Sequence, residues 1–185
     1  TTLSGVMVLR TAEGPYWLSF NVGDSRVYVV GGGGIRQLTH DHSALQEARD
    51  LAATSGAPRV IPPANVVTKA LGAGQTGSVK ADYTIMPLEE GDRAVICTDG
   101  VHGVLRDSQI HAVVAAGDGP QGTADTLVRA SLESATRDNT TAVVVYAGTK
   151  SRVTLTSNVM NRMIQPVRPA SIETARRVPR REGSN

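Results

Sequence analysis

The stretch LSGVMVLRTAEGPYWLSFNVGDSRVYVVGGGGIRQL (3–38) decides the fold class. Its apolar runs are short and rich in β-branched and aromatic residues, and turn residues separate them. These runs lie at 3–10, 16–23, 26–30 and 35–38. Four glycines, Gly31 to Gly34, join the last two, and glycine accepts the positive φ of a tight reversal. We therefore predict hairpins here. A phosphate-binding loop is disfavoured because no helix with Lys and Ser/Thr follows the glycines.

The rest of the chain mixes helical and strand patterns. Ser43 is placed to cap a helix through Gly56, with Gln46 completing a capping box. A second helix is predicted from a cap at Asp107 or Ser108 to Ala116. A third is predicted over 122–135, with Ala124, Leu127, Val128 and Leu132 on its apolar face. Further strands are predicted at 66–71, 78–86, 93–98 and 140–147, the last of buried type. Without a regular βαβ rhythm, these elements indicate a layered α+β fold.

Composition limits the class of protein. The 185 residues are 40% hydrophobic and 3% aromatic, and no apolar run approaches the roughly 20 residues of a membrane-spanning helix. The opening TTLSGVMVLR lacks the features of a signal peptide. A single cysteine, Cys97, excludes an intrachain disulfide and suits a reducing compartment, so we expect a cytoplasmic protein. Its position inside an apolar strand predicts a buried structural thiol.

Charge divides the chain in two. Residues 1–149 carry 11 Lys and Arg against 15 Asp and Glu, a net charge of −4. Residues 150–185 carry 8 against 2, a net charge of +6. We therefore predict a folded body at 1–148 and a basic tail or linker at 149–185. An acidic body with few aromatic residues argues against nucleic-acid binding and favours a site that holds cations.

Three aspartates lie at predicted strand ends beside small residues: Asp24 in NVGDSR, Asp99 in VICTDG and Asp138 in RDNTTAVVV. Convergent carboxylates without a His/Cys cluster suit Mg²⁺ or Mn²⁺ rather than zinc. Each aspartate taken alone is also a common turn residue. Spacing alone therefore predicts an α+β domain in which these aspartates are either turn residues or ligands of a divalent metal.

Five motifs in order resemble the metal-dependent Ser/Thr protein phosphatases, the PPM or type 2C family, in its bacterial form. They are NVGDSRVYVV (21–30), IRQLTHDHS (35–43), VVTKALG (66–72), LEEGDRAVICTDGVHGVL (88–105) and RDNTTAVVV (137–145). The resemblance implies two antiparallel β-sheets packed face to face with helices on the outer faces. It also implies hydrolysis of phosphoserine or phosphothreonine in proteins by a metal-activated water.

The resemblance assigns roles to the three aspartates. Asp99 and Asp138 resemble ligands of a catalytic pair of Mg²⁺ or Mn²⁺ ions, and Asp24 resembles a residue linked to a third ion. Residues 43–65 resemble the flap beside the site. Arg26 and Asn139 are expected to be structural. His40 and His42, which flank Asp41, are assigned structural roles because the family has no metal ligand there. His102 stands near the metal motif, but a surface or core-edge position is the favoured interpretation.

The family's earlier motifs do not occur in this chain. They supply a phosphate-binding arginine, an acidic pair, and an Asp-Gly-His-Gly segment with the aspartate that bridges both metals. We therefore interpret the chain as the C-terminal portion of a phosphatase domain. Alone it is expected to be nearly inactive and to associate through unpaired sheet edges. The alternative is a catalytically inactive, phosphatase-like binding or regulatory module. Ala135 and Thr136 also replace the family's usual Gly-Ser before Asp138.

Overall fold

The computed structural model describes residues 1–55, 61–63, 65–73 and 79–148. Its strands are β1 (Leu3–Thr11), β2 (Gly14–Val22), β3 (Arg26–Gly31), β4 (Gly34–Gln37), β5 (Asp82–Pro87), β6 (Arg93–Cys97) and β7 (Ala142–Tyr146). Its helices are α1 (Ala44–Ser55), α2 (Asp99–His102), α3 (Asp107–Ala116) and α4 (Pro120–Glu133). The predicted tail at 149–185 lies outside the described residues.

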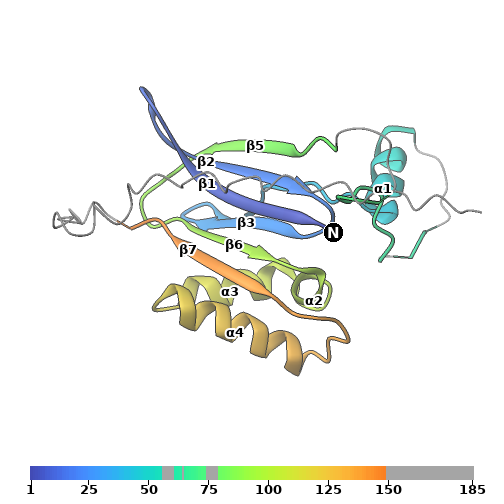
Figure 1. The fold of residues 1–185 in the computed structure, drawn as a ribbon. Coiled ribbons are helices and arrows are strands. Elements are labelled where there is room, and N and C mark those ends of the chain that lie inside the picture. Colours follow the sequence, from blue (N-terminus) through green and yellow to red (C-terminus); the bar gives the residue numbers. More distant parts are fainter. Residues whose placement is uncertain (56–60, 64, 74–78, 149–185) are drawn as a thin grey trace, which may run out of the picture. The chain divides into compact units, whose positions relative to one another are not determined.

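The strands form two antiparallel sheets, as predicted. One has the order β1-β2-β5, and the other has the order β4-β3-β6-β7. Both predicted hairpins, β1–β2 and β3–β4, are present. The four-glycine reversal between β3 and β4 places Gly34 at φ +96°, in the left-handed region that glycine tolerates. Figure 1 shows the two sheets as stacked layers, with α3 and α4 beneath the sheet that contains β6 and β7.

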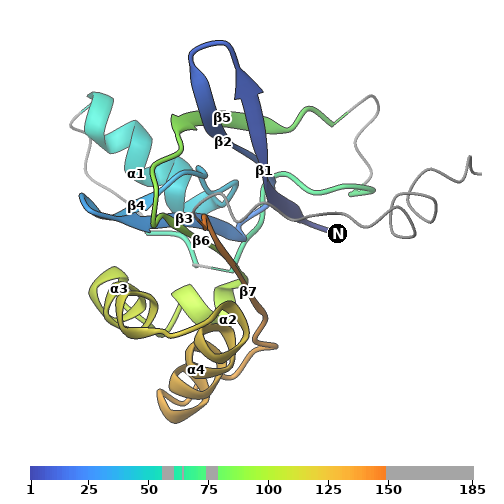
Figure 2. The ribbon, with the colours of Figure 1, turned by 90° about the vertical axis from the view of Figure 1, so that its left-hand side faces the viewer.

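Two hydrophobic cores hold these layers together. The inter-sheet core gathers Trp17 and Met86 from one sheet with Val27, Val29 and Ala94 from the other. The second core lies between the outer face of the β4-β3-β6-β7 sheet and the helices. There Tyr28, Val95 and Val144 pack against Ile110 of α3 and Leu127 of α4. Figure 2 shows the same helices grouped on one side of this sheet. Alternate side chains of β3 and β6 therefore serve opposite cores.

The outer face of the β1-β2-β5 sheet carries apolar side chains. Strand register places Met7, Leu18 and Ile85 side by side on this face, while the next ladder along, Val8, Trp17 and Met86, points toward the other sheet. Met7 is 54% exposed and Ile85 is 58% exposed. In the described part of the chain, helices cover the outer face of the other sheet, and α1 buries none of its residues. Association of the chain with other molecules through its unpaired sheet edges stays a prediction.

Strand β7 differs from the fully buried strand predicted at 140–147. It is an edge strand, and Val143 is 51% exposed. Val144 is buried against the helices, whereas Val143 and Val145 lie in register with Ile96 and Ala94 on the face toward the other sheet. The sequence pattern was misleading because an apolar run does not reveal whether a second layer extends over it.

Two helix predictions need correction in detail. In α4 the buried side chains are Thr123, Ala124, Leu127 and Ser131, and Leu132 is exposed. The Ser131 hydroxyl donates to the Leu127 carbonyl at 2.8 Å, which lets a polar residue occupy the buried stripe. The N-cap of α3 is Arg106, not Asp107 or Ser108, and the Gln109 side chain accepts the Arg106 backbone N–H at 3.0 Å.

The connections on either side of α1 are partly as predicted. Ser43 Oγ accepts the Gln46 N–H at 3.2 Å, so the predicted cap is present. The Gln46 side chain donates to Asp50 instead of returning to Ser43, so the capping box is not formed. The strand predicted at 66–71 is reduced to one isolated bridge between Val67 and Ser43. The loops next to this segment fall partly outside the described residues.

Cys97 is buried, as predicted, at the end of β6. Burial raises the pKa of its thiol to about 12, so the nucleophilic thiolate is absent at neutral pH. Among the described residues, none of the helices has both the length and the apolar character that a membrane crossing requires.

Candidate functional site

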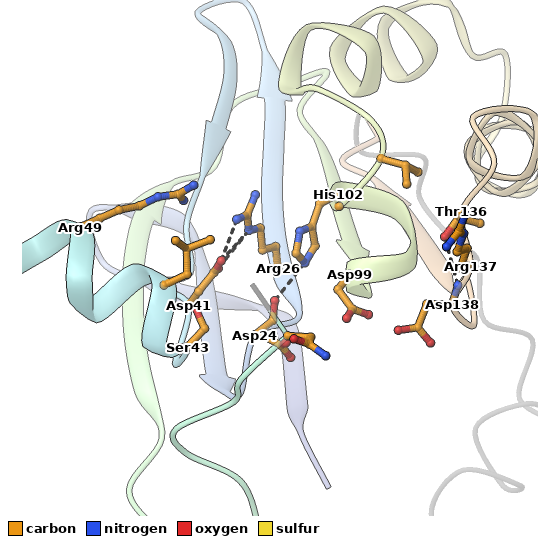
Figure 3. Close-up of a pocket in the computed structure, with 14 residues that line it drawn as sticks. Asp24, Arg26, Asp41, Ser43, Arg49, Asp99, His102, Thr136, Arg137 and Asp138 are labelled. Atoms are coloured by element: carbon orange, nitrogen blue, oxygen red, sulfur yellow. Dashed lines mark hydrogen bonds and ion pairs between the residues drawn. The ribbon is translucent and has the colours of Figure 1, made fainter. Parts of the chain in front are cut away.

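A pocket of about 460 Å³ opens at one end of the strands. It receives side chains from the turn after β2, the segment before α1, helix α2 and the loop before β7. All three aspartates singled out from the sequence, Asp24, Asp99 and Asp138, line it. Figure 3 shows them in the lower part of the opening. The fold thus brings together three acidic segments that are far apart in the sequence.

Strand pairing explains why Asp99 and Asp138 meet. Strands β6 and β7 are antiparallel, with Cys97 opposite Ala142, so the end of one lies beside the start of the other. Thr98 links the two segments. Its hydroxyl donates to the Asn139 carbonyl at 3.2 Å and accepts the Thr141 N–H at 3.1 Å. The Thr98 hydroxyl therefore joins the two segments.

Asp24 reaches the pocket from a tight turn. Gly23, at φ +120°, directly follows β2 and begins this turn. The carboxyl of Asp24 is partly buried. Burial raises its pKa, and the negative charges of Asp99 and Asp41 raise it further. A divalent cation placed beside these carboxylates would offset this repulsion.

An ion pair between β3 and the segment before α1 forms the wall behind the aspartates. Arg26 donates to Asp41 from Nη2 at 2.7 Å and from Nε at 3.0 Å to each carboxylate oxygen. Its Nη1 donates to the Tyr28 hydroxyl at 2.9 Å. Gln37 also donates to Asp41, at 3.1 Å. Arg26 is therefore internally paired, as the sequence predicted.

His102 lies in the pocket rather than at the surface. Its Nε2 is 3.0 Å from the carbonyl oxygen of Asp24, so this nitrogen carries the proton and donates. Burial lowers the pKa of His102, which favours the neutral ring. The side chain thereby connects α2 with the turn that holds Asp24. The half-buried side chain fits the predicted core-edge position, and it also lies beside the metal motif.

His40 and His42 do not form a metal cluster with Asp41. His40 is exposed and pairs with Asp50 at 2.8 Å. His42 accepts the Gly23 N–H at Nδ1 (2.9 Å) and donates from Nε2 to Asp82 at 3.0 Å. Their structural role is as predicted, because His42 braces the backbone next to Asp24.

The donor chemistry of the pocket fits a hard divalent cation, but the set is incomplete. Carboxylate oxygens of Asp24, Asp99 and Asp138 are the ligands that Mg²⁺ and Mn²⁺ prefer. Within the part of the chain that the structure describes, no three His, Cys, Asp or Glu side chains converge closely enough to hold a metal ion. A complete metal pair at this pocket would therefore require ligands from beyond the described residues.

The loop before Asp138 contains a strained residue. Ala135 follows α4 with φ at +59°, and the Ala135 and Thr136 N–H groups cap the helix carbonyls of Leu132 and Ser131. This is a helix end at which glycine is preferred, because a Cβ costs about 1–2 kcal/mol in the left-handed region. The alanine in place of the usual glycine thus leaves the helix end in position but strains it.

Replacing Ala135 with glycine is therefore expected to stabilise the protein. The gain should be about 0.5–1 kcal/mol, since relief of strain exceeds the added chain entropy of glycine. Urea denaturation followed by circular dichroism measures the change. Ala130→Gly, inside the same helix, is the matched control and should destabilise by about 1 kcal/mol. If both variants lose stability equally, the strain at Ala135 is not real.

Sequence analysis missed two arginines that line this pocket, Arg49 of α1 and Arg137 of the loop before β7. The available signal was the spacing of Leu45 and Arg49, which puts both on one face of a helix. The sequence alone did not show that this face turns toward the aspartates.

Comparison with known proteins agrees with the motifs. No family model matches the chain. The Ser/Thr phosphatase Stp of Listeria welshimeri is 28% identical over 126 residues, which cover 68% of this chain and 49% of that protein. The PPM Ser/Thr phosphatase MsPP of Mycobacterium smegmatis, solved with cacodylate, is 31% identical. It superposes with a TM-score of 0.65 over 80% of this chain and 62% of its own.

The chain is similar in sequence and in fold to bacterial PPM-type Ser/Thr phosphatases. The resemblance stated from the motifs and the fold class of two antiparallel sheets with helices are both confirmed. The catalytic domain of the Ser/Thr phosphatase PstP, solved with two manganese ions, is 25% identical. Its TM-score is 0.62 over 77% of this chain and 56% of its own. The chain described here spans about half the length of the curated phosphatases that it matches.

Proposed function

We propose that this chain is a portion of a phosphatase domain that hydrolyses phosphoserine or phosphothreonine in proteins with Mg²⁺ or Mn²⁺. The observation that carries the proposal is the presence of Asp24, Asp99 and Asp138 in one pocket, at the positions that match the family's metal motifs. The names of its relatives support the same reaction class. In this proposal the substrate is a phosphoprotein, and the compartment is the cytoplasm.

In this proposal Asp99 and Asp138 are ligands of the catalytic ions, and Asp24 is linked to a third metal ion. Bound divalent cations would supply charge neutralisation of the phosphate and a water of lowered pKa. The chain's own residues keep the ligands in place. Thr98 joins the segments of Asp99 and Asp138, and His102 fixes the Asp24 turn through its carbonyl. The ligands that these residues lack come from beyond the described part of the chain.

A binding or regulatory module without turnover is the second candidate. The observation that favours it is the absence of three convergent ligands within the described residues. Such a module would keep the pocket and bind phosphorylated peptides without cleaving them. Mn²⁺-dependent phosphate release by the longest native form of the protein would separate the two candidates.

Metal binding by the aspartates can be tested on the chain itself. Titration of Mn²⁺, followed by the electron paramagnetic resonance signal of the free ion, should show weak binding to the 185-residue chain. Asp99→Asn and Asp138→Asn should each weaken it by at least about tenfold, because each removes a charged ligand. The same substitutions should abolish metal-dependent turnover in any longer, active form.

Asp125→Asn, an exposed carboxylate on α4, is the matched control and should bind Mn²⁺ as the wild type does. Hydrolysis of p-nitrophenyl phosphate by the chain alone is expected to be low. Equal Mn²⁺ affinity in all four proteins would remove Asp99 and Asp138 from the site. Robust turnover by the chain alone would show that its own residues complete the ligand set.

A further inference from the structure

Two arginines stand on opposite walls of the pocket. Arg49 belongs to α1, and Arg137 lies in the loop before β7. Both side chains are exposed, so they lie at the rim rather than on the floor. Figure 3 shows Arg49 to one side of the acidic residues and Arg137 to the other. The pocket thus combines a group of carboxylates with guanidinium groups on either side of them.

Helix geometry directs Arg49 to the pocket. Leu45 and Arg49 are four residues apart, share one face of α1 and both line the pocket. The acidic residues of the helix, Glu47 and Asp50, are not part of the lining, and Asp50 is bonded to His40. Among the described residues, Arg49 has neither a hydrogen bond nor an ion pair. The helix therefore presents a cation to the pocket while its acidic side chains lie elsewhere.

Arg137 shows the same property on the opposite wall. The loop around it is held by other groups, since Thr136 Oγ1 accepts the Asp138 N–H and Asp138 Oδ1 accepts the Asn139 N–H. The Arg137 guanidinium itself has no partner within the described part of the chain. Arg26, by contrast, is already occupied by Asp41 and Tyr28. The pocket therefore has two cations available to a ligand, both at its rim.

We propose that Arg49 and Arg137 are specificity-determining contacts that select phosphopeptides with acidic residues on both sides of the phosphorylated residue. This inference rests on the proposed function, which places the phosphate at the aspartates. A peptide centred there extends toward both walls, where a guanidinium fork can pair with a carboxylate in bidentate fashion. Basic flanking residues would meet these arginines with like charge.

Fluorescence anisotropy with two labelled phosphothreonine peptides tests the proposal on the full chain in Mn²⁺ at low salt. One peptide carries Asp and Glu on both sides of the phosphothreonine, and the other carries Lys. The acidic peptide should bind about tenfold more tightly to the wild type. Arg49→Ala and Arg137→Ala should each reduce this ratio about twofold to fivefold, and charge reversal to Glu should reduce it further. The preference should also weaken at 0.5 M salt.

Arg10→Glu provides the matched control, because Arg10 is an exposed arginine on β1 that does not line the pocket. It should leave the binding ratio unchanged. An equal ratio in the wild type, Arg49→Glu and Arg137→Glu would overturn the proposal, as would an equal shift from Arg10→Glu or no detectable binding of the acidic peptide. Failure of the proposed function would appear separately, as absence of Mn²⁺-dependent phosphate release by the longest native form of the protein, since the binding ratio needs no turnover.

Discussion

Gly100→Ala is expected to lower the free energy of unfolding by about 3 kcal/mol, because the added Cβ has no space. A Cβ at this position would overlap the carbonyl oxygen of Asn139 and lie 2.9 Å from both its carbonyl carbon and Thr140 Oγ1. Two of these three atoms are backbone and cannot rotate away. Gly100 follows Asp99, and Asn139 follows Asp138. The substitution therefore forces apart the two segments that carry the predicted metal ligands.

Urea denaturation followed by the fluorescence of Trp17, the single tryptophan, measures this loss. Gly32→Ala is the matched control, since nothing lies within 4 Å of a Cβ built at Gly32. That variant should lie within about 0.5 kcal/mol of the wild type. Gly100→Ala should also weaken Mn²⁺ binding more than its loss of folded protein explains. A midpoint shift equal to that of Gly32→Ala would show that the segments do not touch.

Arg26→Ala is expected to destabilise the protein by about 3–5 kcal/mol at neutral pH. The Asp41 side chain is 7% exposed and would be left as a buried charge without its cation. Asp24, whose pKa burial already raises, lies in the same pocket and would add repulsion. The loss therefore comes from the stranded carboxylate more than from the arginine itself.

A double variant identifies this cause. Arg26→Met combined with Asp41→Leu should recover most of the stability, since neither charge then remains buried. Urea denaturation of the wild type, Arg26→Ala and the double variant measures the losses. A double variant no more stable than Arg26→Ala would assign the loss to packing.

Much of the fold follows from local sequence. The hairpins are encoded by short apolar runs with turn residues between them, and the glycine at position 34 supplies the positive φ that the second turn needs. The errors are non-local. Leu132 and Val143 look like core residues by spacing, but their exposure depends on which other layer lies over them. A buried serine, Ser131, took a core position because its hydroxyl bonds within the helix.

The site was predictable in part for the same reason. Asp24, Asp99 and Asp138 carry motif signals in the sequence, and strand pairing brings their segments to one pocket. Arg49 and Arg137 carry no comparable motif. Their relation to the aspartates depends on how α1 and the loop after α4 are placed around the sheets, which local pattern does not reveal.

The sheet order has a consequence for synthesis of the chain. Strand β3 ends at Gly31, but its partner β6 begins only at Arg93. Strand β5, which pairs with β2, is likewise synthesised long after β2. At about 5–20 residues per second, a ribosome takes on the order of several seconds to deliver these partners. During that interval the first two hairpins leave the exit tunnel with one long edge each unpaired. Until β5 and β6 are made, these edges are open to pairing with a wrong strand.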